Sequence, residues 1–343
     1  MITLLIALAC FCARSSAKED STLTRLAENV YAHVVSPDGN AVANAGVLVL
    51  EHSVLVFDTH FTPEAGQALL AAIRSITPKP VRYVVNSHAH ADHTHGNQAF
   101  ADAQLIGSIA ARRDALELDL PSMNRTLVIA QRQLAAMRRD LGKEQDPAQT
   151  GKLREQIKVR EDYLQTMSRL KIMPPVVTTG DGIKIIDGRK EVRLLFLGKG
   201  HTDGDLVLFL PAEKIAFVGD LFFNDAIPNV QDASILEWIR TLEGILKLEA
   251  DQFVPGHGPI GARKDVEKFQ AYFRDLQALV QSAVDRGDTM EQATRDLTTP
   301  TKYSSYKFQN FFPSNVQKMY AELKALQLSK MPAKPPVKSG TNP

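Results

Sequence analysis

A short cluster of metal-binding side chains constrains this chain more than any other feature. The segment that follows the apolar run 81–85 reads Ser87-His88-Ala89-His90-Ala91-Asp92-His93. In an extended or turning segment, His88 and His90 project to the same side, so both imidazoles can reach one ion. Asp92 and His93 fall past the bend, where they can hold a second ion. The spacing predicts a metal site at the end of a buried strand; the alternative is a chance cluster of surface histidines.

Three more candidate ligands stand just after strand-like runs. His201 follows the run 192–197, Asp220 follows 215–218 and His257 follows 253–254. Each has a glycine nearby, which lets the backbone turn sharply and present the side chain. Together with the first cluster they make a predicted set of seven ligands for two ions: His88, His90, Asp92, His93, His201, Asp220 and His257.

The order of apolar patterns predicts a mixed sheet. Strand-like runs at 29–35, 46–50 and 54–57 precede a helical pattern at 63–76 and the strand 81–85. Strand, helix and strand in this order form a crossover unit, which places the histidine loop at a strand's carboxyl end. Later strands are expected at 183–186, 192–197, 206–210, 215–218 and 253–254, with helices at 235–248, 262–286 and 313–328. Trp238 is expected to anchor the core.

Residues 109–174 do not continue this series of strands and helices. Apolar residues recur at three and four residues on both sides of Asp146-Pro147, which is a helix stop. This pattern predicts an antiparallel helical hairpin that packs partly on itself. Two interpretations remain open. The hairpin is either a solvated insertion, or it overhangs the histidine loop, residues 87–93, and contacts a partner subunit.

The N-terminal segment indicates export. Residues 1–13 are mostly apolar, and Ser15 and Ala17 fit the small-x-small rule for cleavage after Ala17. We therefore expect residues 1–17 to be a signal peptide and the protein to be periplasmic or secreted. A buried N-terminal element and a lipid-attached Cys10 are the alternatives, because no basic segment precedes the apolar run. Residues 331–343 are rich in proline and lysine and are expected to be disordered.

Composition narrows the partners and the metal ligands. The 343-residue chain has a formal charge of +1 and 44% hydrophobic residues, so neither a basic face for nucleic acid nor a small core is indicated. We expect a small-molecule substrate, no nucleic acid and no membrane association after signal cleavage; the sequence leaves the oligomeric state open. Both cysteines lie in the first 17 residues, so histidine and carboxylate groups must hold the metals.

The combined motifs resemble the metallo-β-lactamase superfamily of metallohydrolases. They read His-x-His-x-Asp-His, Gly-His-Thr, Gly-Asp and Pro-Gly-His-Gly, and the resemblance covers about residues 30–262. It implies an α+β fold, a four-layer αββα sandwich with the metals at one edge between the sheets. Here the domain would span 24–330, with the helical hairpin inserted at about 109–174 and C-terminal helices at about 262–328.

The resemblance also assigns roles by position. His88, His90 and His201 would hold the first metal, Asp92, His93 and His257 the second, and Asp220 would bridge them. An aspartate at the bridging position is found in glyoxalase II, lactonases and related hydrolases, and points away from a dedicated β-lactamase. Asp58 falls where the family carries an orienting aspartate, although a solvated turn residue is the alternative. No basic cluster for glutathione is recognisable, which argues against glyoxalase II itself.

Other residues have open interpretations. His95 replaces a glycine of glyoxalase-like members and could touch substrate, whereas His33, His52 and His60 read as structural or surface residues. Specificity is expected from the loop 40–44, Phe61, the hairpin and residues 222–232. Phe222 and Phe223 could line an apolar pocket or pack in the core. The three remaining candidates for the mouth of the site are Tyr303, Tyr306 and Lys307.

Two Zn²⁺ ions suit this ligand set, and iron or manganese is possible. Two such ions would share a water and lower its pKa towards ~7, which leaves hydroxide as nucleophile, with Asp92 to orient it. We therefore predict a binuclear zinc metallohydrolase that cleaves an ester-like bond, a thioester, lactone or lactam, in a small molecule. The alternatives are a β-lactamase, an iron-dependent oxidoreductase of the sulfur dioxygenase type, and a non-catalytic binding module.

Overall fold

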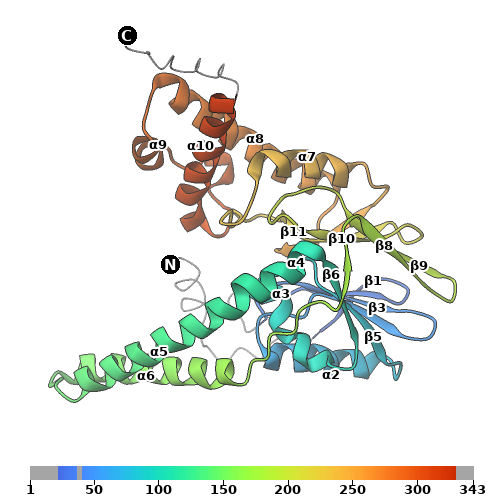
Figure 1. Cartoon of the computed structure of the whole chain (residues 1–343), viewed down its shortest axis with the longest axis horizontal. Helices are drawn as coiled ribbons and strands as arrows, with labels where there is room; N and C mark the ends of the chain where they lie inside the picture. Colours follow the sequence, from blue (N-terminus) through green and yellow to red (C-terminus); the bar gives the residue numbers. More distant parts are fainter. Residues whose placement is uncertain (1–21, 37–40, 330–343) are drawn as a thin grey trace, which may run out of the picture.

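Two β-sheets lie face to face in the computed structural model, which describes residues 22–36 and 41–329 (Figure 1). The predicted signal peptide at 1–17, residues 37–40 and the tail 331–343 lie outside these ranges. Helices cover the outer face of each sheet, α2 on one side and α7 and α8 on the other. The layers therefore run helix, sheet, sheet, helix, as the predicted αββα sandwich requires.

The first sheet has seven strands in the order β1 to β7, and it changes from antiparallel to parallel pairing at β4. The predicted crossover is confirmed, with α2 (Pro63–Ile76) connecting the parallel neighbours β4 and β5, and β3 and β4 pair as an antiparallel hairpin. Because β3 and β4 are buried on both faces, they read as continuous apolar runs. The strands are β1 (Thr24–Ala27), β2 (Val30–His33), β3 (Ala45–Val49), β4 (Val54–Phe57), β5 (Val81–Val85), β6 (Gln104–Ser108) and β7 (Val177–Thr179).

The second sheet has five strands in the order β12-β11-β10-β9-β8. Its strands pair antiparallel except β11 and β12, which are parallel and are connected through α7 (Ile235–Leu246). A turn at residues 211–214 joins β10 to β11. The strands are β8 (Gly182–Asp187), β9 (Lys190–Phe196), β10 (Leu206–Leu210), β11 (Ile215–Phe223) and β12 (Gln252–His257).

Three apolar layers hold the sandwich together. Leu48 and Phe57 from the first sheet meet Leu194 and Phe217 from the second between the sheets. Leu69 and Ile73 of α2 pack on the outer face of the first sheet. Outside the second sheet, α7 packs with α8 (Arg263–Arg286) and α10 (Phe312–Ser329) around the fully buried Trp238, which is the predicted core anchor.

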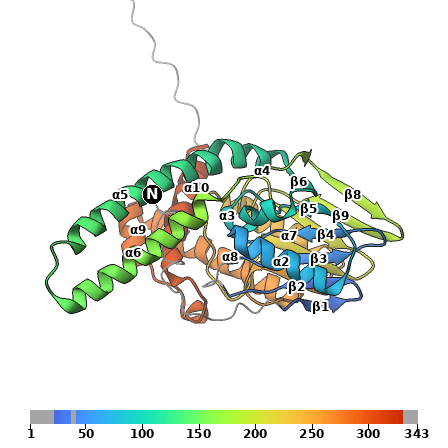
Figure 2. The same ribbon diagram turned by 90° about the horizontal axis from the view of Figure 1, so that it is seen from below.

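The predicted helical hairpin is present and projects from the sandwich (Figures 1 and 2). It begins with α4 (Ile109–Asp114) and a π-helical turn, η2 (Ala115–Asp119), and continues as α5 (Leu120–Leu141) and α6 (Pro147–Ser168). Asp146 caps α6 by accepting a hydrogen bond from the Ala148 amide at 2.8 Å. The two long helices bury a small apolar cluster of their own, which explains why the hairpin stays apart from the main core.

The structure corrects several predicted boundaries. β11 and β12 run further than the sequence indicated, so Asp220 lies within β11 and His257 ends β12. Gly219, with φ of +52°, breaks the β11–β12 register just before Asp220, which hides the continuation of the strand. The strands β1, β6 and β7 and the helix α9 (Met290–Asp296) were not predicted, because β1 and β7 are mostly exposed, β6 has only two large apolar residues, and α9 spans only two turns.

The remaining short elements are α3 (Ala91–Thr94) and the 3-10 turns η1 (His95–Phe100), η3 (Thr301–Tyr303) and η4 (Gln309–Phe311). The helices formed by residues 22–36 and 41–329 include none with the length and apolar content needed to cross a membrane.

A close backbone contact joins α2 to η1, the turn that follows the histidine loop and α3, and it gives a stability test. A Cβ on Gly66 would lie 2.6 Å from the carbonyl oxygen of Gly96, so Gly66→Ala is expected to lower the free energy of unfolding by about 1–3 kcal/mol. Gly151→Ala in exposed α6, where a Cβ meets nothing within 4 Å, is the matched control and should raise it by up to ~1 kcal/mol. Denaturant unfolding of both variants measures the difference, and equal stabilities would contradict the packing argument.

Candidate metal centre

The structure brings all seven predicted ligand side chains together at one edge of the sandwich. His88, His90, His201 and Asp220 form one group, and Asp92, His93 and His257 form a second. Within each group the potential ligand atoms lie within 4.8 Å of one another. Asp220 lies between the groups, because its Oδ2 is 3.2 Å from His201 Nε2 and its Oδ1 is 3.2 Å from His93 Nε2. Side chains that are far apart in sequence therefore converge on space for two ions.

Asp58 fixes the orientation of two of these histidines. Its Oδ2 accepts a hydrogen bond from His93 Nδ1 at 2.8 Å and another from the Ser87 hydroxyl at 2.7 Å. The Ser87 oxygen in turn accepts from His88 Nδ1 at 2.9 Å. Both imidazoles therefore carry their proton on Nδ1 and direct the Nε2 lone pair away from Asp58. The orienting position of Asp58 is confirmed, and the alternative of a solvated turn residue is wrong, because its side chain is 1% exposed.

The Nε2 atoms left by this network fit metal ligands. Among the described residues, the buried His88 Nε2 has no hydrogen-bond partner, and the buried His93 Nε2 faces carboxylate oxygens of the cluster, Asp220 Oδ1 at 3.2 Å and Asp92 Oδ2 at 3.7 Å. A buried polar atom without a partner is costly, and a bound cation would remove that cost. With histidine and carboxylate as the only donors, the set suits zinc and does not exclude iron or manganese. The cluster could therefore bind metal.

His90 is oriented by a residue that the sequence did not reveal as a partner. Its Nδ1 lies 2.8 Å from His201 Nε2, and its Nε2 donates to Asp232 Oδ2 at 3.0 Å. An outer carboxylate that holds the second ring nitrogen fixes which nitrogen faces a metal. Asp232 lies in the loop before α7, twelve residues after Asp220, and no periodic pattern there indicates a partner for His90.

The charges of the cluster balance only with added positive charge. Burial raises the pKa of Asp220, but His257, His93 and His201 outweigh this effect and hold the pKa well below its usual value. Burial lowers the pKa of His257, yet Asp220 and Asp92 raise it to about 9. The carboxylates thus stay ionised and need cations beside them, either protons on the imidazoles or metal ions.

Glycines let the backbone come close to these side chains. A Cβ on Gly256 would lie 1.9 Å from Asp220 Oδ1, so only glycine can precede His257 in this arrangement. Gly219, beside Asp220, has φ of +52°, which L side chains rarely adopt, and a Cβ there would lie 2.7 Å from the Ser87 Cβ. Gly219 and Gly256, which stand next to candidate ligands in the sequence, are therefore needed for close packing around the site.

The loop that carries His201 is held by a buried carboxylate. Asp205 accepts hydrogen bonds from the Thr202 amide through Oδ2 and from the Thr202 hydroxyl through Oδ1, both at 2.8 Å. Burial raises the pKa of Asp205 to about 6, and the bonds from Thr202 only partly counter this. The clamp fixes the loop that presents His201.

The helical hairpin contacts His95, which lies two residues after His93 at the start of η1. His95 Nε2 lies 3.2 Å from Asp119 Oδ2 at the root of the hairpin, and the His95 ring stacks on Phe61 at 5.8 Å between centroids. Phe61 packs in turn against the apolar cluster inside the hairpin. The root of the hairpin is therefore attached next to the histidine loop through His95, which lies outside both ligand groups. That the hairpin overhangs the loop and contacts a partner subunit stays a prediction.

Other sequence candidates lie in supporting positions. His33 and His60 are buried and face each other at 2.8 Å, and His52 is exposed, as expected. Tyr303 and Tyr306 are buried against α8, so they do not reach the metal cluster. Phe222 packs in the core against Phe269, whereas Phe223 stacks on His257 at 4.9 Å.

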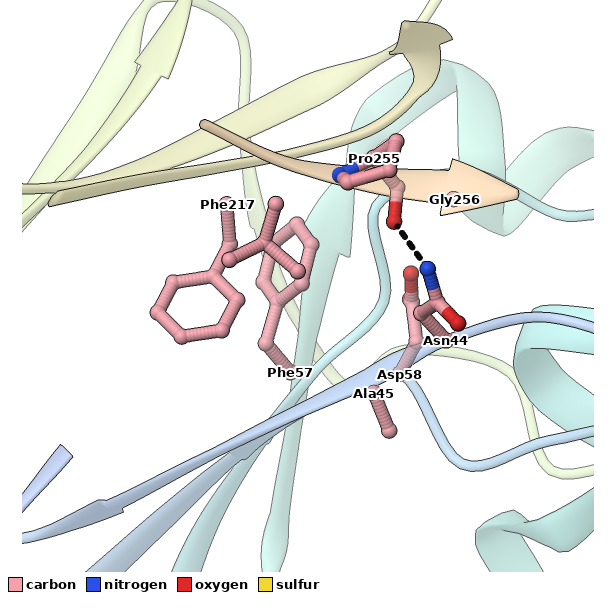
Figure 3. Close-up of a pocket in the computed structure, with 9 residues that line it drawn as sticks. Asn44, Ala45, Phe57, Asp58, Phe217, Pro255 and Gly256 are labelled. Carbon is pink, nitrogen blue, oxygen red and sulfur yellow. Dashed lines mark hydrogen bonds between the residues drawn. The ribbon is translucent and has the colours of Figure 1, made fainter. Parts of the chain in front are cut away.

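A small cavity lies between the sheets near Asp58 (Figure 3). Asn44 borders it and donates hydrogen bonds to the carbonyl oxygens of Pro255 and Gly258, both at 2.9 Å. The cavity measures about 10 Å³, which is room for one water at most. It is too small for a substrate, and the role of Asn44 is to hold the loop around His257.

These features define a metallo-β-lactamase-type protein, and comparison with known families agrees. The family model of the metallo-beta-lactamase superfamily matches residues 38–257, so the chain belongs to this superfamily. Members of the superfamily are metallohydrolases. A solved metallo-β-lactamase from Pontibacter korlensis is 18% identical, with a TM-score of 0.55 over 74% of this chain and 98% of that chain. That likeness supports the fold.

Two curated relatives differ in what they act on. A linear primary-alkylsulfatase from Pseudomonas sp. (strain ATCC 19151) is 22% identical over 266 residues, which is 74% of this chain and 49% of that protein. The chain thus spans about half the length of this relative. A metallo-beta-lactamase type 2 from Bacillus cereus is 25% identical over 250 residues, 71% of this chain and 78% of that protein.

Removal of Asp232 tests its role in orienting His90. Asp232→Ala should lower zinc affinity by roughly 10-fold to 100-fold, the usual effect of losing such an outer partner. Because the Asp232 side chain is 47% exposed, stability of the metal-free protein should change little. Competition with a chromogenic chelator measures the affinity, with exposed Asp102→Ala as control. Equal zinc affinity in the two variants would count against this role.

Asp205 gives a pH-dependent stability difference. Between about pH 4 and pH 6 the folded protein retains a proton that unfolded Asp205, with its ordinary pKa of 3.8, has released, so stability falls as pH rises. Asp205→Asn removes the charge; its Oδ1 can still accept from the Thr202 amide, and its Nδ2 then donates to the Thr202 hydroxyl in place of accepting from it. Relative to wild type, the variant should gain about 3 kcal/mol across that window. Denaturant unfolding with chelator present measures this difference, and a constant difference would overturn the argument.

Proposed function

We propose that this superfamily hydrolase uses two zinc ions to cleave an ester-like bond, a thioester, lactone or lactam, in a small molecule. The observation that carries the proposal is the convergence of seven ligand-type side chains in two groups around Asp220. The fixed tautomers of His88 and His93 support it, because both rings already direct Nε2 into the cluster, and Nε2 of His88 has no hydrogen-bond partner there. Proteins keep such arrangements at functional sites.

Each residue has a role in the proposed reaction. His88, His90 and His201 would hold one zinc ion, Asp92, His93 and His257 the other, and Asp220 both. When bound, the two ions supply an acidified water and a Lewis acid for the substrate carbonyl. Asp92 is the carboxylate of the cluster that solvent reaches, since its side chain is 22% exposed and that of Asp220 is 3% exposed. Asp92 Oδ2 would therefore orient the attacking water.

The named relatives give two further substrates to test. The Bacillus cereus relative is a metallo-β-lactamase, which supports lactam opening as a second candidate activity, although aspartate occupies the bridging position here. The Pseudomonas relative is an alkylsulfatase, which adds a sulfate ester. Steady-state kinetics on a penicillin, a thioester, a lactone and an alkyl sulfate would rank these activities.

Metal content separates the hydrolase from an oxidoreductase. The ligand set accepts iron as well as zinc, so an iron-dependent oxidoreductase of the sulfur dioxygenase type is the competing function. Protein purified without added metal should contain two zinc ions per chain. Stoichiometric iron together with oxygen consumption would replace the hydrolase proposal. Export to the periplasm or the medium is part of the proposal and rests on the leader sequence alone.

Asp92→Ala tests the proposed mechanism. Loss of the group that orients the water should lower kcat by roughly 100-fold to 10,000-fold. The free energy of unfolding should change far less, because the side chain is partly exposed. Asp102→Ala, which removes an exposed carboxylate ten residues away, is the control. Turnover is compared at equal measured zinc content, and wild-type rates in the Asp92 variant would exclude this mechanism.

A further inference from the structure

Phe308 has a strained backbone close to the metal cluster. Its φ is +61° and its ψ is 39°, the left-handed region that a bulky L residue rarely adopts. Such conformations persist only where the surrounding structure enforces them, and they concentrate at functional sites. The residue lies just before η4, in the segment that joins α9 to α10 and beyond the range matched by the superfamily model.

The chain around Phe308 is fixed on both sides. The Lys307 amide donates to the Asp225 carbonyl at 2.9 Å, and the Ile227 amide donates to the Lys307 carbonyl at 2.9 Å. The Phe311 amide then donates to the Phe308 carbonyl at 2.9 Å. These bonds attach the segment to the loop after β11, which carries Asp220. The position of the Phe308 ring is therefore set relative to the metal cluster.

The ring lies beside a candidate ligand. The centroids of the Phe308 and His257 rings are 6.3 Å apart, and the rings are perpendicular. Phe223 stacks on His257 at 4.9 Å, so His257 is bordered by two aromatic rings. Phe223 is buried, whereas Phe308 is only partly buried. His257 Nε2 lies 3.2 Å from Asp92 Oδ2, and Asp92 is on the side of the cluster that solvent reaches.

We infer that Phe308 is a specificity-determining residue that contacts an apolar arm of the substrate next to the scissile bond. The ring packs on one side against Phe311 and the core, and the left-handed backbone gives the chain the direction that leaves the ring partly exposed beside His257. The inference rests on the proposed function and adds the substrate class, an ester-like compound with an apolar group. Burial of such a group against an aromatic ring is favourable in proportion to the area covered.

Phe308→Gly tests this inference because it removes the ring and the strain together. Glycine adopts positive φ without cost, so the variant is expected to fold. Phe308→Leu restores apolar bulk and should recover part of the effect. Lys214→Gly is the matched control, since Lys214 has φ of 56° in an exposed turn at the start of β11, away from the cluster. It relieves backbone strain without touching the site.

Two ester series provide the activity readout, one varied from two to six carbons in the acyl arm and one in the alcohol arm. In one series the wild type should prefer the six-carbon arm by roughly tenfold or more in kcat/KM, mainly through KM. Phe308→Gly should remove this preference by lowering kcat/KM on the six-carbon ester towards its value on the two-carbon ester, compared at equal zinc content, whereas Lys214→Gly should keep the preference. The same preference in wild type and Phe308→Gly, or an equal loss on all esters, would overturn the inference.

A binding measurement separates failure of this inference from failure of the proposed function. Calorimetry of the zinc-loaded protein compares hexanoate with acetate, and no turnover is needed. The wild type and Lys214→Gly should bind hexanoate roughly tenfold more tightly than acetate, and Phe308→Gly should bind them equally. Absence of hydrolysis with this binding pattern would reject the hydrolase but keep the apolar subsite. Equal hexanoate binding by wild type and Phe308→Gly would reject the subsite whatever the activity.

Discussion

Uncompensated negative charge between the two sheets is the constraint on which this structure depends. Asp58 and Asp220 are almost wholly buried, and Asp92 lies beside Asp220 in a cluster that holds five imidazoles. Carboxylates are costly to bury unless they are paired and hydrogen-bonded. The protein meets this requirement with imidazoles oriented by Asp58 and Ser87 and, in the proposed function, with two divalent cations. Stability and metal binding are therefore linked, because the same atoms serve both.

The sandwich produces this cluster by the way its strands end. Asp58 follows β4, the histidine loop follows β5, and His201 follows β9, while Asp220 and His257 lie near the ends of β11 and β12. Parallel neighbours such as β4 with β5 and β11 with β12 bring their carboxyl ends to the same edge. Two sheets that face each other then place both sets of side chains at one edge. The ligands converge because of topology, and no long loop is needed to bring them together.

The sequence was sufficient to predict the candidate metal ligands and insufficient to predict the residues that surround them. The seven ligand positions, the orienting Asp58, α2 and the helical hairpin could be predicted, because each leaves a local signal: close histidine spacing, glycine beside a strand end, or an apolar period. Asp232, Asp119 and Phe308 leave no such signal. Each acts through a partner far away in sequence, from a loop or a turn, and its spacing says nothing about that partner. The strands β1 and β7 were not predicted because they are mostly exposed and lack the continuous apolar run that marks β4, which is as short as β1.

The difference between predictable ligands and unpredictable surrounding residues has a physical basis, and it bears on substrate selection. Groups that bind metal must meet strict distances and angles, so they stand on rigid strand ends whose sequence pattern is narrow. Groups that contact the non-reacting part of a substrate need only present surface of the right polarity, so many loop sequences can serve. Under the inference drawn for Phe308, the C-terminal segment supplies such a surface beside His257. The hairpin root packs beside the same cluster through His95 and Phe61. On the proposed function, the sandwich would set the chemistry and the segments packed beside it would select the substrate.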